Sequence, residues 1–180
     1  MLARHRGPAR AEGRDEVSAD SLPVRVARLL NDFMGQLHAA RCSQKIWLKV
    51  HDDPRYRVAA KYGFQIAFGT IALTMRKFED FYKHDFPRLI PDKGRRPAEA
   101  RWLVQESKKR HLRAVTNTLI AHYKDEKRQL PSASEIGRLI EKGGWRTEEE
   151  LMTWVGPVIE RLEAVRNAIM AYHNVKRLEE

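Results

Sequence analysis

The sequence predicts an all-α protein, a compact bundle of about five helices behind a disordered N-terminal tail. Apolar residues recur at steps of three and four along three long stretches, which is the spacing of one face of an α-helix. Helix-start and helix-stop residues separate these stretches, and no alternating strand pattern of useful length interrupts them. A chain of 180 residues is long enough for one core, so we expect a single helical domain over residues 21–180.

The first two helices follow a polar N-terminal segment. Residues 1–20 are rich in Arg, Gly and Ala and have little apolar surface to bury, which predicts a disordered tail. The first helix is expected to start at Ser21 and Pro23 and to run to about Val50. The cluster Asp52-Asp53-Pro54 should break it and cap the second helix. That helix carries a long apolar stripe: Tyr56, Ala60, Phe64, Ala67, Ile71, Met75, Phe78 and Tyr82.

A turn region and two further helices are expected next. The turn region contains residues that exclude a regular helix: Pro87, Pro91, Gly94 and Pro97. A third helix then runs from Pro97 to about Lys127. The following short helix has Ser132 and Glu135 at the spacing of a capping box and Gly143-Gly144 as its stop.

The last helix shows the most regular pattern in the chain. Thr147 and Glu150 repeat the capping-box spacing, and Pro157 is a potential kink in the second turn. Steps of four and three suit packing against an antiparallel neighbour or a second protomer, and we expect a homodimer through this C-terminal helix. The heptad seam consists of Leu151, Val155, Val158, Leu162, Val165, Ile169 and Tyr172.

The charge balance is basic, with 34 Lys+Arg against 24 Asp+Glu and a net charge of +10. Between Pro87 and Arg128, twelve basic and five acidic residues leave +7. Such a patch neutralises phosphate backbones, and RNA is the partner we expect; the alternative is a solvated helix face. The candidate nucleic-acid-binding residues are Arg95, Arg96, Lys108, Lys109, Arg110, Arg113 and Lys124.

Several function classes are disfavoured by the residues present. The single cysteine, Cys42, excludes an intramolecular disulfide and a Cys-based zinc site. No glycine-rich phosphate loop and no metal-ligand spacing occurs, so we expect neither a cofactor nor a metal. No run of residues is apolar for long enough to span a bilayer, and the N-terminus has no secretory signal. We therefore expect a cytoplasmic protein with no membrane partner.

His122 ends an apolar stripe within Ala114–Glu126, in helical phase with Leu112, Val115 and Leu119. A His in such a position is more often a hydrogen-bonded core residue than a catalyst. The string from Asn117 through His122 to Asp125 nevertheless resembles the signature helix of the HEPN superfamily, and most closely its abortive-infection branch. That resemblance implies a helical bundle, usually dimeric. Many members are metal-independent endoribonucleases of toxin–antitoxin or abortive-infection systems, which would give this chain a cognate antitoxin or defence partner.

The resemblance also implies roles for individual residues. His122 would act as general acid or base at a ribose hydroxyl, an Arg would bind the phosphate, and Asn117 would orient the phosphate or the imidazole. Thr116 stands where the family has its Arg. Arg113 lies nine residues before His122 and is half a turn out of phase with it. An Arg from elsewhere in the fold must therefore complete the site, or the site is inactive.

A second candidate site lies in the last helix, where Arg166-Asn167 precedes His173. Arg166 and His173 are seven residues apart and share one face, which matches the spacing of the family motif. The alternative is an exposed interface edge at which Arg166 pairs with Glu163. The sequence thus leaves three functions open: a ribonuclease, an inactive RNA- or partner-binding module, and a structural helical oligomer.

Overall fold

The computed structural model of the chain describes residues 21–50, 52–124 and 132–175. The side chains of 61, 119–124, 133 and 136 are not among the described parts. These residues form helices and no strand, which confirms the all-α prediction. The tail predicted for residues 1–20 lies outside the described residues. The elements are α1 (Leu22–Val50), α2 (Arg57–His84), α3 (Phe86–Leu89), η1 (Lys93–Arg95), α4 (Ala98–Lys109), α5 (Leu112–Lys124), α6 (Ala133–Lys142) and α7 (Glu148–Tyr172).

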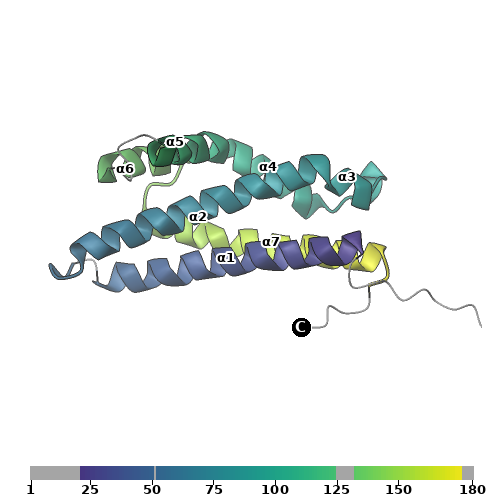
Figure 1. Ribbon diagram of the computed structural model, residues 1–180, viewed down its shortest axis with the longest axis horizontal. Helices are drawn as coiled ribbons and strands as arrows, with labels where there is room; N and C mark the ends of the chain where they lie inside the picture. The colour runs from purple at the N-terminus through teal and green to yellow at the C-terminus, as the bar shows by residue number, and fades with distance from the viewer. Residues whose placement is uncertain (1–20, 51, 125–131, 176–180) are drawn as a thin grey trace, which may run out of the picture.

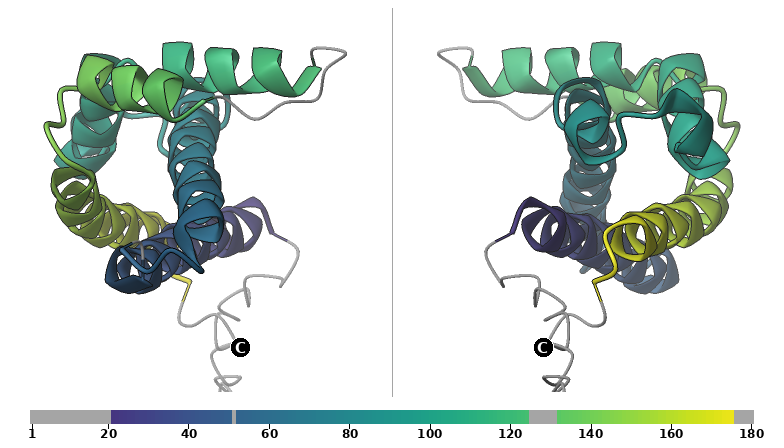
Figure 2. Two further views of the ribbon diagram at one scale, coloured as in Figure 1. Left: turned by 90° about the vertical axis from the view of Figure 1, so that its left-hand side faces the viewer. Right: turned by 90° about the vertical axis from the view of Figure 1, so that its right-hand side faces the viewer.

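Three long helices, α1, α2 and α7, run alongside one another, and α4 lies over them on the side away from α1 (Figure 1). α5 lies across this bundle, and its C-terminal end extends past α2 (Figure 2). The core fills the space between these helices. Its largest fully buried side chains include Leu30, Leu37, Phe68, Phe78 and Leu103.

The turn between α1 and α2 is built differently from the prediction. α2 begins at Arg57, and its N-cap residue Tyr56 makes no side-chain cap. Asp53, expected to cap this helix, instead accepts hydrogen bonds from the backbone N–H of Arg55 at 2.9 Å and from its guanidinium at 2.6 Å. The Arg55 guanidinium holds the pKa of the Asp53 carboxyl below its ordinary value. The Asp53 carboxylate is thereby bound within the turn and does not cap α2.

The region from His84 to Lys124 contains two departures from the prediction. Phe86–Leu89 forms a one-turn helix where four Pro and Gly residues were expected to exclude one. Pro87 lies in its first turn, where a missing N–H costs no hydrogen bond. The single helix expected from Pro97 to Lys127 is two helices, because His111 takes a positive φ of 52° between α4 and α5. The bundle is consequently divided into more helices than the five expected.

The C-terminal half of the chain follows the prediction closely. Ser132 and Glu135 form the capping box of α6, Gly143 ends it, and Thr147 caps α7. Six residues of the α7 seam have no exposed surface, namely Leu151, Val155, Val158, Leu162, Val165 and Ile169. Their contacts are with α1 and α4 of the same chain. The seam thus packs inside the bundle, which matches the antiparallel-neighbour alternative and leaves the predicted homodimer without this surface.

Candidate nucleic-acid interface

Arg110 is one of the predicted phosphate-binding residues, and the structure gives it a different role. Its Nη1 donates to the carbonyl oxygens of Gly143 and Gly144 at 3.0 and 3.1 Å. Its guanidinium lies 4.8 Å from the ring centroid of Trp145, and its Nε donates to Glu106 at 3.4 Å. The side chain is only 19% exposed. Arg110 therefore joins the α4–α5 junction to the loop between α6 and α7.

Three other predicted residues, Arg96, Arg95 and Lys109, also form hydrogen bonds or ion pairs within the chain. Arg96 Nε donates to the carbonyl oxygen of Ile90 at 2.9 Å, which fixes the segment before α4. Arg95 pairs with Asp92 at 3.6 Å on the surface, and Lys109 pairs with Glu106 at 3.5 Å. α4 has 12 residues and is about 18 Å long, so it separates Arg95 and Arg96 from the α4–α5 junction. The basic residues from 95 to 124 accordingly do not form one patch.

Thr116 occupies the position that the HEPN resemblance assigns to an Arg. It is buried, with 2% of its surface exposed, and its Oγ1 donates to the carbonyl oxygen of Leu112 at 2.8 Å. An Arg at this position would put a charge into the core without a counter-charge. The packing at this position therefore favours a small side chain whose hydroxyl is satisfied by its own helix.

Arg76 of α2 brings an arginine to the motif helix. Its Nη1 donates to Oδ1 of Asn117 at 2.6 Å, and Asn117 is otherwise exposed. Arg113 is also exposed and lies four residues before Asn117, so the two side chains share one side of α5. We call Arg76, Arg113 and Asn117 the basic face. Lys108, at the end of α4, is exposed as well and makes no ion pair among the described residues.

No pattern in the sequence indicated a site role for Arg76. The hydrogen bond to Asn117 spans 41 residues, and Arg76 lies in a helix whose pattern indicated only a core stripe. Only the packing of α2 against α5 brings this cation to Asn117. Arg76 thus reaches Asn117 from another helix of the chain.

His122 and Lys124 belong to α5, but their side chains are outside the described residues. Their helical phase still follows from the backbone. Lys124 is in line with Arg113 and Asn117, at steps of four and seven. His122 is five residues after Asn117 and therefore about 140° around the helix from it. A catalytic role for His122 stays a prediction.

The second candidate site, at Arg166 and His173, is divided between two sets of contacts. Arg166 donates to Glu163 at 3.0 Å, to Asn31 of α1 at 2.7 Å and to Asn167 at 3.0 Å. His173 follows the last residue of α7, and its Nε2 lies 2.9 Å from the carbonyl oxygen of Leu89. Both side chains thus link α7 to neighbouring elements, and the pairing of Arg166 with Glu163 is the one that the alternative interpretation expected.

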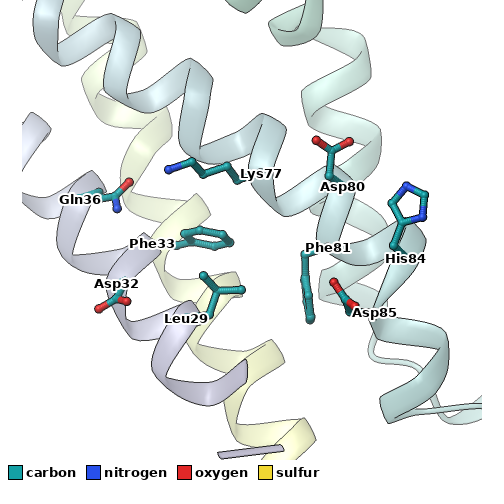
Figure 3. A pocket seen from close by; sticks show the side chains of 9 residues that line it. All are labelled: Leu29, Asp32, Phe33, Gln36, Lys77, Asp80, Phe81, His84 and Asp85. Atoms are coloured by element: carbon teal, nitrogen blue, oxygen red, sulfur yellow. The ribbon is translucent and has the colours of Figure 1, made fainter. Parts of the chain in front are cut away.

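A groove lies between α1 and α2 (Figure 3). It holds about 540 Å³. Leu29, Phe33 and Phe81 form its apolar floor, and at its end the hydroxyl of Thr74 donates to Gln36 at 3.0 Å. Its rim carries charged or titratable side chains, namely Asp32, Lys77, Asp80, His84 and Asp85. The rim is thus acidic, in contrast to the chain as a whole.

Within the described part of the chain, no three His, Cys, Asp or Glu side chains are grouped so as to hold a metal ion. Among the same residues, no helix is both long and apolar enough to cross a bilayer. Comparison of the chain with protein-family models, curated proteins and solved structures finds no match to any of them. The function therefore has to be argued from the residues themselves.

Proposed function

We propose that this chain is an RNA-binding helical protein and that its basic face holds RNA phosphates. The observation that carries the proposal is the hydrogen bond from Arg76 to Asn117, which brings a second guanidinium to the side of α5 that already presents Arg113. Exposed Arg113 and Asn117 of α5, together with half-buried Arg76 of α2, form a surface suited to phosphate oxygens.

The chemistry of the basic face supports this role. A guanidinium has five N–H donors, and the bond to Asn117 uses one nitrogen of Arg76. That bond fixes the orientation of the Arg76 guanidinium, so the side chain loses less conformational entropy when a phosphate binds. Asn117 retains its NH₂ group as a further donor. Lys108, at the end of α4, is a further exposed cation.

Binding is tested by fluorescence anisotropy with a short single-stranded RNA. The double variant Arg76→Gln/Arg113→Gln should bind at least about tenfold more weakly, a loss of about 1.4 kcal/mol. The matched control is Arg88→Gln/Arg95→Gln, which removes the same charge from exposed positions on α3 and η1. An equal loss in both variants would show that only net charge matters and would reject the basic face. Equal affinity for DNA of the same sequence would reject RNA as the specific partner.

A metal-independent endoribonuclease of a bacterial defence or toxin–antitoxin system is the second candidate function. Arg76 is the observation in its favour, because this side chain brings a guanidinium from α2 to Asn117. Its site would comprise His122 with Asn117, or Arg166, Asn167 and His173. Such an enzyme would be cytoplasmic and would have a cognate antitoxin or defence partner.

Cleavage is tested by incubating RNA with the protein and a chelator. If the protein is a ribonuclease, the RNA should be cleaved. Cleavage should be lost with His122→Ala, or with His173→Ala if the second site is used, while anisotropy still reports binding. If the wild-type protein leaves the RNA intact, the ribonuclease hypothesis is rejected and the RNA-binding proposal is unaffected.

A further inference from the structure

Positive and negative charges on α4 lie on opposite sides of the helix. Its two acids, Glu99 and Glu106, are seven residues apart and therefore in line. Glu106 accepts a hydrogen bond from the indole of Trp154 of α7 at 3.2 Å, so this line faces α7. Arg101 and Lys108 each follow one of the acids by two residues, which places them about 200° further around the helix. These two cations therefore point away from α7.

The fold does not use the charge of these two residues, which we call the α4 cations. Arg101 and Lys108 are exposed, and neither makes an ion pair within the described part of the chain. Gln105, between them on the exposed side, is neutral. The neighbouring Lys109, by contrast, pairs with Glu106 at 3.5 Å. The α4 cations are thus available to an external polyanion.

A contact between α4 and α2 places the α4 cations beside the basic face. The hydroxyl of Ser107 donates to the carboxylate of Glu79, so Ser107 marks the side of α4 that faces α2. Lys108 is the next residue and lies about 100° further around, on the side away from α7. On α2, Arg76 is three residues before Glu79, or about 4.5 Å along the helix, and donates to Asn117 of α5. Lys108 is therefore within about one helical turn of the basic face.

α5 crosses α2 on this same side of the bundle. α4 ends at Lys109 and α5 begins at Leu112, so the two helices follow one another directly. From there α5 runs over α2 and extends past it (Figure 2). The two helices thus meet at an angle, with the basic face on α5 and the α4 cations on α4.

The acidic side chains nearby belong to α2 and leave the exposed side of α4 positive. Glu79 is half-buried between the two helices, where it accepts the hydrogen bond from Ser107. Asp80 is exposed but lies on the rim of the groove of Figure 3, between α1 and α2. A polyanion that leaves the basic face therefore meets cations along α4 and carboxylates along α2.

We propose that RNA bound at the basic face continues along α4, past Lys108 to Arg101, a proposal that rests on the RNA-binding function above. The α4 cations are about 10 Å apart along the helix axis. A base-stacked strand carries one phosphate per about 3.4 Å, so this distance corresponds to about three nucleotides. The ligand class is accordingly an oligonucleotide long enough to reach both surfaces, and not a mononucleotide or another small phosphate ester.

The extension is tested by fluorescence anisotropy with an RNA dodecamer and an RNA tetramer. Arg101→Gln/Lys108→Gln should weaken binding of the dodecamer at least about fivefold, because two phosphate contacts are lost. The same variant should bind the tetramer within about twofold of the wild type, since the basic face alone holds so short a strand. Both side chains are exposed, so the circular dichroism spectrum should not change.

The matched control is Lys45→Gln/Lys109→Gln, which removes the same charge from exposed positions on α1 and α4. It should bind the dodecamer within about twofold of the wild type. An equal loss in the two double variants would reduce the effect to net charge and overturn the proposal. An equal fold-loss for tetramer and dodecamer would overturn the extension along α4.

The failure of this proposal is distinguishable from the failure of the proposed function. If Arg101→Gln/Lys108→Gln binds the dodecamer as tightly as the wild type while Arg76→Gln/Arg113→Gln does not, the extension is rejected and the basic face stands. If neither variant is weakened, both proposals are rejected. Displacement of the dodecamer by polyglutamate of equal charge as readily as by unlabelled RNA would overturn RNA as the ligand and indicate an acidic protein segment.

Discussion

Arg110 and Arg113 are three residues apart, and the fold treats them in opposite ways. Arg110 lies at the end of α4 with its guanidinium against Trp145 and the carbonyl oxygens of Gly143 and Gly144. Arg113 lies in the first turn of α5 and is exposed. The difference shows that a run of basic residues is not one functional unit. Some of its cations hold helices together, and only the remainder are free to bind a polyanion.

The neighbours decide which role a cation takes. Arg110 meets two aromatic rings, and the carboxylate of Glu106 that it contacts also accepts a hydrogen bond from the indole of Trp154 at 3.2 Å. Each of these contacts stabilises the guanidinium in one fixed orientation. The left-handed residue His111 between the two arginines turns the chain, so Arg113 emerges on another side of the molecule.

The largest effect is expected from removing the structural cation. Arg110→Ala should lower the free energy of unfolding by about 2–3 kcal/mol, since two carbonyl oxygens and Glu106 lose a partly buried charged donor. Arg113→Ala is the matched control and should change stability by less than about 0.5 kcal/mol. Urea unfolding followed by circular dichroism measures both. Equal stabilities of the two variants would contradict the division of roles.

A smaller effect is expected when Arg110 keeps its charge but loses its shape. Arg110→Lys should lower the free energy of unfolding by about 1–2 kcal/mol, because an ammonium group cannot reproduce the planar fork or its stacking on Trp145. The same urea titration compares it with the alanine variant. If the lysine variant is as stable as the wild type, charge alone explains the site and the stacking contributes nothing.

Arg96 and Arg95 offer the same contrast at the other end of α4. Arg96→Ala should cost about 1 kcal/mol through the lost hydrogen bond to Ile90. Arg95→Ala should cost less than about 0.5 kcal/mol, since its ion pair with Asp92 is exposed. Thermal unfolding compares the stabilities of the two variants. A larger loss for Arg95→Ala than for Arg96→Ala would contradict these roles.

The smallest effect concerns an exposed pair in the α1–α2 turn. The Arg55 guanidinium lowers the pKa of Asp53, so the stabilising contribution is present above the ordinary pKa and is lost as pH falls through the lowered one. Asp53→Asn should therefore have a slightly lower Tm than the wild type at about pH 7 and an equal Tm at about pH 2. A difference in Tm between the two proteins that grows towards low pH would contradict the lowered pKa of Asp53.

The sequence predicted the helices far better than it predicted which elements pack against them. The α7 seam and the core stripe of α2 have the same periodicity, and both are buried by neighbouring helices of this chain. Periodicity identifies an apolar face and does not say which element covers it. For that reason a seam expected to join two protomers packs internally. Val58 and Ile66 of α2, which lie outside its core stripe, remain exposed.

The candidate site was predictable only in part for a related reason. Asn117 and Arg113 could be chosen from the sequence because both lie on the motif helix. Arg76 could not, since only tertiary packing brings α2 to α5. The burial of Thr116 likewise depends on the side from which the bundle covers α5. Local patterns fix a helix and its phase, whereas the composition of a site depends on contacts between helices.

The salt dependence of RNA binding tests the central claim most directly. The slope of log Kobs against log salt, measured between about 50 and 200 mM, counts the phosphates that the protein neutralises. If the basic face holds phosphates, Arg76→Gln/Arg113→Gln should make this slope shallower by about 1.4, or about 0.7 per lost contact with a single strand. Arg88→Gln/Arg95→Gln should leave it unchanged. Identical slopes for the wild type and the Arg76/Arg113 variant would contradict the assignment of the basic face.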